Sequence, residues 1–197
     1  YTFSGWQPTP PAPALSSTFP AANAEYTALW TEKGDTPYKI EHWQQNIDDD
    51  GYTIVNDDTQ LLQGQSGAAI TVMPHTYTGF TYEKQEPASP TIAADGTTIV
   101  KVYYKRITYA VTYNVVGEAG GHGSISVTAV TGGTISASPV MVRHGGSVTF
   151  TATPDSGWEV DSWTVSPGAF ASGGGTGTTA TLSNISGSPT VTVKFKP

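Results

Sequence analysis

One sequence element occurs twice in full in this chain and a third time in altered form. Each full copy is a turn glycine beside an aromatic residue, followed 25 residues later by an aromatic in a closing strand: Gly5 leads to Trp30, and Gly79 to Tyr104. The third copy, around Gly157, has a glycine-rich insertion before its closing strand. Such repetition is typical of a modular array. It argues against an enzyme, whose site residues would be scattered and unique.

The composition favours β-structure. The 197 residues include 22 glycines and 14 prolines but only 13% charged residues, which is typical of strands joined by turns. A net charge of −7 and dispersed basic residues speak against nucleic-acid binding, which needs clustered Lys and Arg. No apolar run approaches the roughly 18 residues of a membrane helix, so we expect no membrane insertion. The absence of cysteine excludes disulfides and thiolate chemistry.

The places where apolar alternation restarts predict three domains. Residues 1–32 hold a glycine–aromatic turn, a proline-rich crossing and a closing strand, which is too little to bury a core alone. We interpret them as the C-terminal half of a truncated unit whose first half lies upstream. Residues 33–106 form a second unit and residues 107–197 a third.

Strands dominate the predicted secondary structure. In the second unit, a hairpin turns at 48–51 and a closing strand covers 98–104. No segment has a helical period over ten or more residues, so we expect at most about one helical turn per unit. In the third unit, period-two alternation predicts strands over 109–115, 123–129, 147–152, 159–165, 179–182 and 190–195.

The first two units carry motifs of bacterial surface-protein repeats. The turn Phe3-Ser4-Gly5-Trp6 and the closing strand 26–30 resemble the end of the internalin-type B-repeat, also called the Listeria–Bacteroides repeat. In residues 37–106, an opening Tyr-x-Ile-x-His strand, an acidic D-x-D-G turn and a V-x-V-Y-Y closing strand resemble mucin-binding-protein-like repeats. These resemblances imply a β-grasp-like (ubiquitin-like) fold for both units.

The third unit carries the most specific motifs. Segments 145–154, 157–163 and 190–195 resemble the divergent B-repeat family, which implies a small all-β module. Together the three resemblances imply a place in large secreted or wall-attached proteins of the bacterial cell surface. They bring no catalytic residues and no cofactor to this chain.

The acidic turn has the spacing of a calcium-binding loop. Such a loop supplies oxygen ligands at positions one, three, five and twelve, with glycine at six. Here those positions are Asn46, Asp48, Asp50 and Asp57, with Gly51 at six. Positions one and twelve depart from the usual Asp and Glu, and the flanking segments are strands. We favour a polar hairpin turn with positive φ at Asp50-Gly51 over a calcium site.

The tryptophans could bind a ligand or fill the core. Exposed rings could stack on sugars, but alternation puts Trp6, Trp30 and Trp158 in core positions, where small β units need large side chains. This leaves Trp43 and Trp163 as candidate ligand-binding rings. Trp163 follows Trp158 by five positions, which puts them on opposite faces of an unbroken strand. We therefore expect Trp163 to face outward unless a bulge intervenes.

We expect a non-catalytic, monomeric segment of an extracellular bacterial surface protein, acting as a stalk or spacer, with adhesion as a further role. One alternative is a module that binds a host glycan, mucin or protein. Another is an accessory module of an extracellular polysaccharide-degrading enzyme. The linkers 30–38 and 104–109 have lengths common between adjacent elements, so we expect the units in an extended series.

Overall fold

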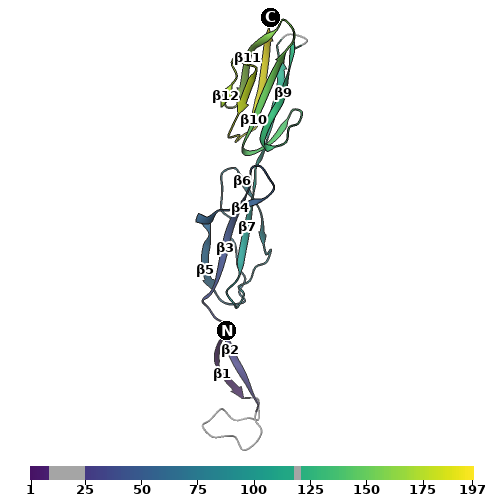
Figure 1. Ribbon diagram of the computed structural model, residues 1–197. Coiled ribbons are helices and arrows are strands. Elements are labelled where there is room, and N and C mark those ends of the chain that lie inside the picture. Colours follow the sequence, from purple (N-terminus) through teal and green to yellow (C-terminus); the bar gives the residue numbers. More distant parts are fainter. Residues whose placement is uncertain (9–24, 118–120) are drawn as a thin grey trace, which may run out of the picture. The chain divides into compact units, whose positions relative to one another are not determined.

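The computed structural model describes residues 1–8, 25–117 and 121–197, and these residues are almost entirely β-structure (Figure 1). Within these ranges the only helical segment is the 3-10 turn η1 (Asn56–Asp58), and no helix could cross a membrane. The mainly-β prediction is therefore confirmed. The β-grasp detail stays a prediction.

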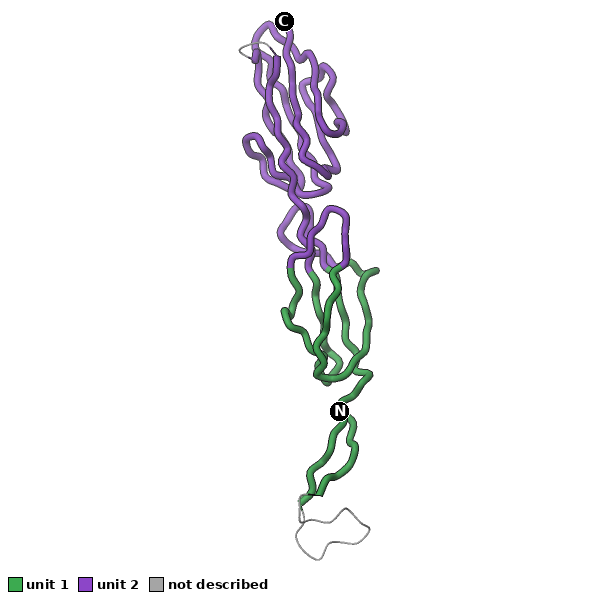
Figure 2. Tube along the Cα trace, turned by 180° about the vertical axis from the view of Figure 1, so that it is seen from behind, with its two compact units in different colours: residues 1–42, 55–74, 84–102 green, residues 43–54, 75–83, 103–197 purple. Residues whose placement is uncertain are grey.

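The chain divides into two compact units (Figure 2). Unit 1 comprises residues 1–42, 55–74 and 84–102, and unit 2 comprises 43–54, 75–83 and 103–197. Strands β3 (Thr36–Gln45) and β7 (Ile99–Arg106) contribute residues to both units. The predicted domain boundaries after residues 32 and 106 stay a prediction.

Near the N-terminus, β1 (Thr2–Pro8) and β2 (Tyr26–Thr31) form a two-stranded antiparallel sheet. The ring of Phe3 contacts those of Trp6 and Trp30 edge-on, with 5.5 Å between centroids in both pairs. Trp6 is nevertheless 51% exposed and Trp30 60% exposed, so the prediction that they are core residues is wrong. Two strands alone cannot cover large rings on both sides. Most of the predicted proline-rich crossing lies outside the described residues.

A five-stranded sheet follows, with the order β4-β3-β7-β6 and with β5 also paired to β3. β3 is long enough to pair with β4 near its end and with β5 near its start. Along β7 the side chains of Val100, Val102 and Tyr104 are buried in alternation, as period two requires. The remaining strands are β4 (Tyr52–Ile54), β5 (Gln60–Gly64) and β6 (Phe80–Glu86).

The seven C-terminal strands form the third sheet, with the order β11-β14-β8-β10-β13-β12 and with β9 on β10. All pairs are antiparallel except β8 with β14, the first and last strands, which run parallel. The strands are β8 (Thr108–Val116), β9 (Gly123–Gly133), β10 (Val140–Pro154), β11 (Glu159–Ser166), β12 (Ser172–Gly173), β13 (Thr179–Leu182) and β14 (Thr190–Lys196).

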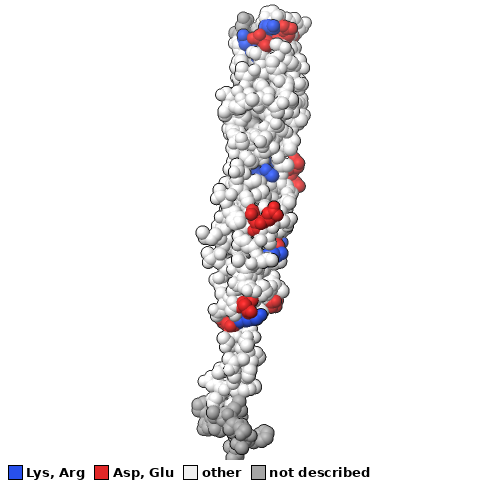
Figure 3. Space-filling model, turned by 90° about the vertical axis from the view of Figure 1, so that its left-hand side faces the viewer, with Lys and Arg blue, Asp and Glu red and all other residues white. Residues whose placement is uncertain are grey.

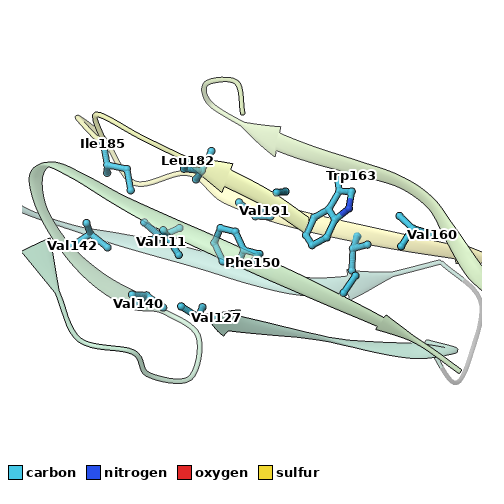
Figure 4. Packing of buried hydrophobic residues seen from close by; sticks show 14 of the residues in the cluster. Val111, Val127, Val140, Val142, Phe150, Val160, Trp163, Leu182, Ile185 and Val191 are labelled. Atoms are coloured by element: carbon cyan, nitrogen blue, oxygen red, sulfur yellow. The ribbon is translucent and has the colours of Figure 1, made fainter. Parts of the chain in front are cut away.

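The core of these strands is built by period-two alternation. Along β10, Val148, Phe150 and Ala152 are buried, while Thr149 and Thr151 between them lie on the other face. Figure 4 shows the ring of Phe150 at the centre of the cluster, close to Trp163 and Val191.

Truncating the central ring should therefore destabilise the protein. Phe150→Ala removes a fully buried ring, and we expect it to lower the free energy of unfolding by about 3–5 kcal/mol. Thr153→Ala, on the exposed face of the same strand, should change it by less than about 0.5 kcal/mol. Chemical denaturation of the two variants measures both effects, and equal losses would contradict this description of the core.

Candidate functional site

The acidic turn joins β3 to β4 as a hairpin and folds around the carboxylate of Asp49. The Asn46 side-chain amide and the Gly51 backbone N–H donate to the same Asp49 oxygen, over 2.8 and 2.6 Å. The Thr53 hydroxyl donates to the side-chain oxygen Oδ1 of Asn46 over 2.7 Å, which holds the amide in place. The hydrogen bond from Asn46, followed by that from Gly51, holds the pKa of Asp49 below its ordinary value.

Gly51 has a different role from the predicted one. It does not adopt the positive φ that we expected at Asp50-Gly51. Instead, a Cβ at Gly51 would lie 2.8 Å from the carboxylate oxygen of Asp49 and 3.1 Å from the side-chain nitrogen of Asn46. Glycine is needed here to make room for the Asp49 carboxylate, not for its backbone freedom.

The positively charged side chain of Arg143 binds the acidic turn. Arg143 of β10 donates from Nη1 to the backbone carbonyls of Ile47 and Asp49, over 3.1 and 2.6 Å. Its Nη2 forms an ion pair with the carboxylate of Asp50. Because Asp50 is largely exposed, the ion pair itself contributes less than about 1 kcal/mol. The two hydrogen bonds from the charged group to backbone carbonyls dominate.

The second arginine lies nearby, at the end of β7. Arg106 donates from Nε to the Gln45 carbonyl over 2.8 Å and from Nη1 to the His144 carbonyl over 3.0 Å. Its guanidinium carbon lies 4.7 Å from the centre of the Phe80 ring. Burial, and then the charge of Arg143, lower the pKa of Arg106, while the charge of Asp48 opposes them. The chain has only these two arginines, and both donate hydrogen bonds to backbone carbonyls at this end of the sheet.

The predicted calcium ligands are used in other ways. Asn46 binds Asp49 and Thr53, and Asp50 binds Arg143. Asp57 lies in the turn η1. Nowhere in the described ranges do three or more His, Cys, Asp or Glu residues gather as a metal site would require. The calcium assignment to Asn46, Asp48, Asp50 and Asp57 stays a prediction. The geometry favours the hairpin interpretation.

The candidate ring Trp43 belongs to a half-buried aromatic cluster. Its ring lies 6.4 Å from that of Tyr103 at an interplanar angle of 34°, and the Tyr52 ring meets Tyr103 at 77° over 5.0 Å. The Tyr52 hydroxyl donates to Glu83, and burial together with this carboxylate raises the pKa of Tyr52 to about 12. The three rings pack against one another at an angle and do not form a coplanar platform.

The second candidate ring, Trp163, lies in the core. It is 7% exposed, and its indole N–H donates to the Gly177 carbonyl over 2.8 Å (Figure 4). Trp163 therefore does not face outward, because the bulge that the expectation named as its exception is present. A bulge in β11 between Val160 and Ser162 shifts the alternation by one residue, so Trp158 and Trp163 both pack on the same core. Trp158 is partly buried there, as predicted, and its ring stacks on His122 at 3.6 Å.

The hydrogen bonds of the acidic turn predict how Asp49 titrates. Replacing Asn46 by Ala should raise the pKa of Asp49 towards 3.8, because it removes the largest cause of the lowering. Since the pKa is lowered in the folded state, the turn's stabilisation is present above the unfolded pKa and lost as the pH falls through the folded one. Side-chain carboxyl NMR measures the pKa of Asp49 in the original protein and in the Asn46→Ala variant. Asp95, whose pKa is lowered by the backbone and hydroxyl of Thr97, serves as an unchanged reference.

Calcium should leave the stability unchanged. A ligand that binds only the folded state raises the melting temperature, but Arg143 already binds Asp50 and the backbone carbonyls of Ile47 and Asp49 in this turn. We therefore expect equal melting temperatures in millimolar calcium chloride and in a chelator. A rise with calcium that Asp48→Ala abolishes would restore the calcium interpretation.

Comparison with known proteins finds a match for the C-terminal segment. Residues 123–197, which run from β9 to β14, match the family model of the divergent InlB B-repeat domain. No curated protein matches the chain. The family match falls inside the segment 108–197, for which the sequence motifs predicted this resemblance. That prediction is confirmed: the C-terminal sheet is similar to the divergent InlB B-repeat domain.

Proposed function

We propose that this chain is a non-catalytic repeat segment of a secreted or wall-attached bacterial surface protein, and that it acts as a spacer. The observation that carries the proposal is the match of residues 123–197 to a B-repeat domain, because such repeats occur in bacterial surface proteins. The spacer would hold a distal domain away from the cell wall. A monomer suffices for this role.

The topology of the C-terminal sheet supports a spacer. β8 and β14 are its first and last strands, and they run parallel, with Thr112 opposite Thr190 and Val116 opposite Lys194. Parallel neighbours begin at the same edge of a sheet and end at the opposite edge. The chain therefore enters this sheet at one end and leaves it at the other. Modules joined in this way extend an array with each repeat.

The surface is also consistent with a spacer. On the face drawn in Figure 3, the charged side chains form small groups, some of mixed sign and some of one sign, separated by wide uncharged areas. A nucleic acid or another strongly charged partner would need a larger area of one sign. The largest ring of the C-terminal core, Trp163, is used for packing.

A glycan- or mucin-binding module is the second candidate. The half-buried cluster of Trp43, Tyr52 and Tyr103 favours it, since partly exposed rings are the usual contact surface for sugars. An accessory module of a polysaccharide-degrading enzyme would use the same rings. Binding on a glycan array that Trp43→Ala removes would support this candidate.

Small-angle scattering tests the spacer. The short linkers predict modules in series, so the radius of gyration should be well above the roughly 16 Å of a compact globule of this length. Sedimentation in the same buffer should show a monomer. A radius close to the compact value would contradict the spacer and favour a binding site formed between modules.

A further inference from the structure

The C-terminal sheet has the strand arrangement of a clamp that resists pulling along the chain. Its first and last strands, β8 and β14, are paired with each other over residues 112–116 and 190–194. The backbone N–H of Thr112 also donates to the Pro189 carbonyl over 3.0 Å, and that of Ala110 donates to the Ser188 hydroxyl over 3.2 Å. Within this sheet, a force applied along the chain therefore reaches this pair first.

We propose that β8 and β14 form a shear clamp that lets the module carry tension without unfolding. The inference rests on the proposed spacer, because a chain between a cell and its target is pulled at both ends. In a parallel pair, the pulled end of β8 and the pulled end of β14 lie at opposite ends of the ladder. Tension then slides one strand along the other and loads all hydrogen bonds together. Peeling the strands apart would load them one at a time.

The core protects these hydrogen bonds from water. Val191 and Val193 of β14 and Val111 of β8 have no exposed surface, and Phe195 is also buried. A water molecule cannot reach the bonds from that side while the strands slide. On the other face, Thr164 and Thr192 share a hydrogen bond over 2.6 Å, and Lys194 pairs with Asp161 over 3.0 Å, so β11 holds β14 in place.

The start of β8 is anchored as well. Directly before it, the Ile107 N–H donates to the Gly79 carbonyl over 2.9 Å, and the His144 N–H donates to the Ile107 carbonyl over 2.7 Å. Arg106, one residue earlier, binds the carbonyls of Gln45 and His144. Tension therefore enters β8 along a segment whose backbone is held on both sides, and β8 cannot peel away from that end.

Single-molecule force spectroscopy of the full chain tests the clamp with one pair of strands pulled in two directions. The chain has no cysteine, so introduced cysteines provide unique thiol handles. Thr108→Cys with Pro197→Cys pulls β8 and β14 from opposite ends, in shear. Val116→Cys with Pro197→Cys pulls them from the same end and peels them apart. Thr108 and Val116 are exposed, so neither handle disturbs the core.

We expect the unfolding force to be several times larger in the shearing direction than in the peeling direction. Two core variants provide a matched control: Val193→Ala lies under the clamp, and Val148→Ala lies in the same core on β10. Both should lower the melting temperature, but only Val193→Ala should lower the shearing force markedly. Equal forces in both directions, or equal losses in both variants, would overturn the clamp. The scattering measurement would still decide the spacer separately.

Discussion

The pairing of β8 with β14 is the interaction on which the C-terminal sheet depends. These strands are the two ends of the segment, and their contact closes the sheet between β10 and β11. Without it, β11 and β14 would form a separate two-stranded sheet, and the valines of β14 would lose their cover. A closing contact between strands so far apart in sequence is costly in chain entropy. The pairing offsets this cost by completing a core in which Val111, Val191 and Val193 have no exposed surface.

At the end of the five-stranded sheet, the two arginines supply hydrogen-bond donors to backbone carbonyls. A polar turn rich in backbone carbonyls needs donors, and the turn itself has few. Arg143 supplies them to Ile47 and Asp49, and Arg106 supplies them to Gln45 and His144. The two positive charges lie close enough for Arg143 to lower the pKa of Arg106, and Asp48 offsets part of that repulsion. Hydrogen bonding to the backbone, more than ion pairing, holds the turn.

The sequence predicted local structure well because local structure follows from alternation and turn chemistry. The hairpin around 48–51 and the strands 123–129, 159–165, 179–182 and 190–195 all lie where they were expected. The errors have long-range or single-residue causes. For Trp163 the sequence left two outcomes open, outward or shifted by a bulge, and only the structure shows the bulge, because no period-two pattern reveals one. The partner of the acidic turn, Arg143, lies 93 residues from Asp50, beyond the reach of any motif. The incomplete cover of Trp6 and Trp30 likewise depends on neighbours that alternation alone does not supply.

The repeated glycine is not equivalent in its three copies. Gly5, Gly79 and Gly157 all have positive φ, so each copy needs glycine for its backbone. Only at Gly79 does a neighbour also exclude a side chain, because a Cβ there would lie 1.9 Å from Cδ2 of His144. The equivalent positions at Gly5 and Gly157 are open. Glycine at position 79 therefore has two separate requirements, the backbone conformation and the space that the His144 ring occupies, so a substitution there should be tolerated less well than one at Gly5 or Gly157.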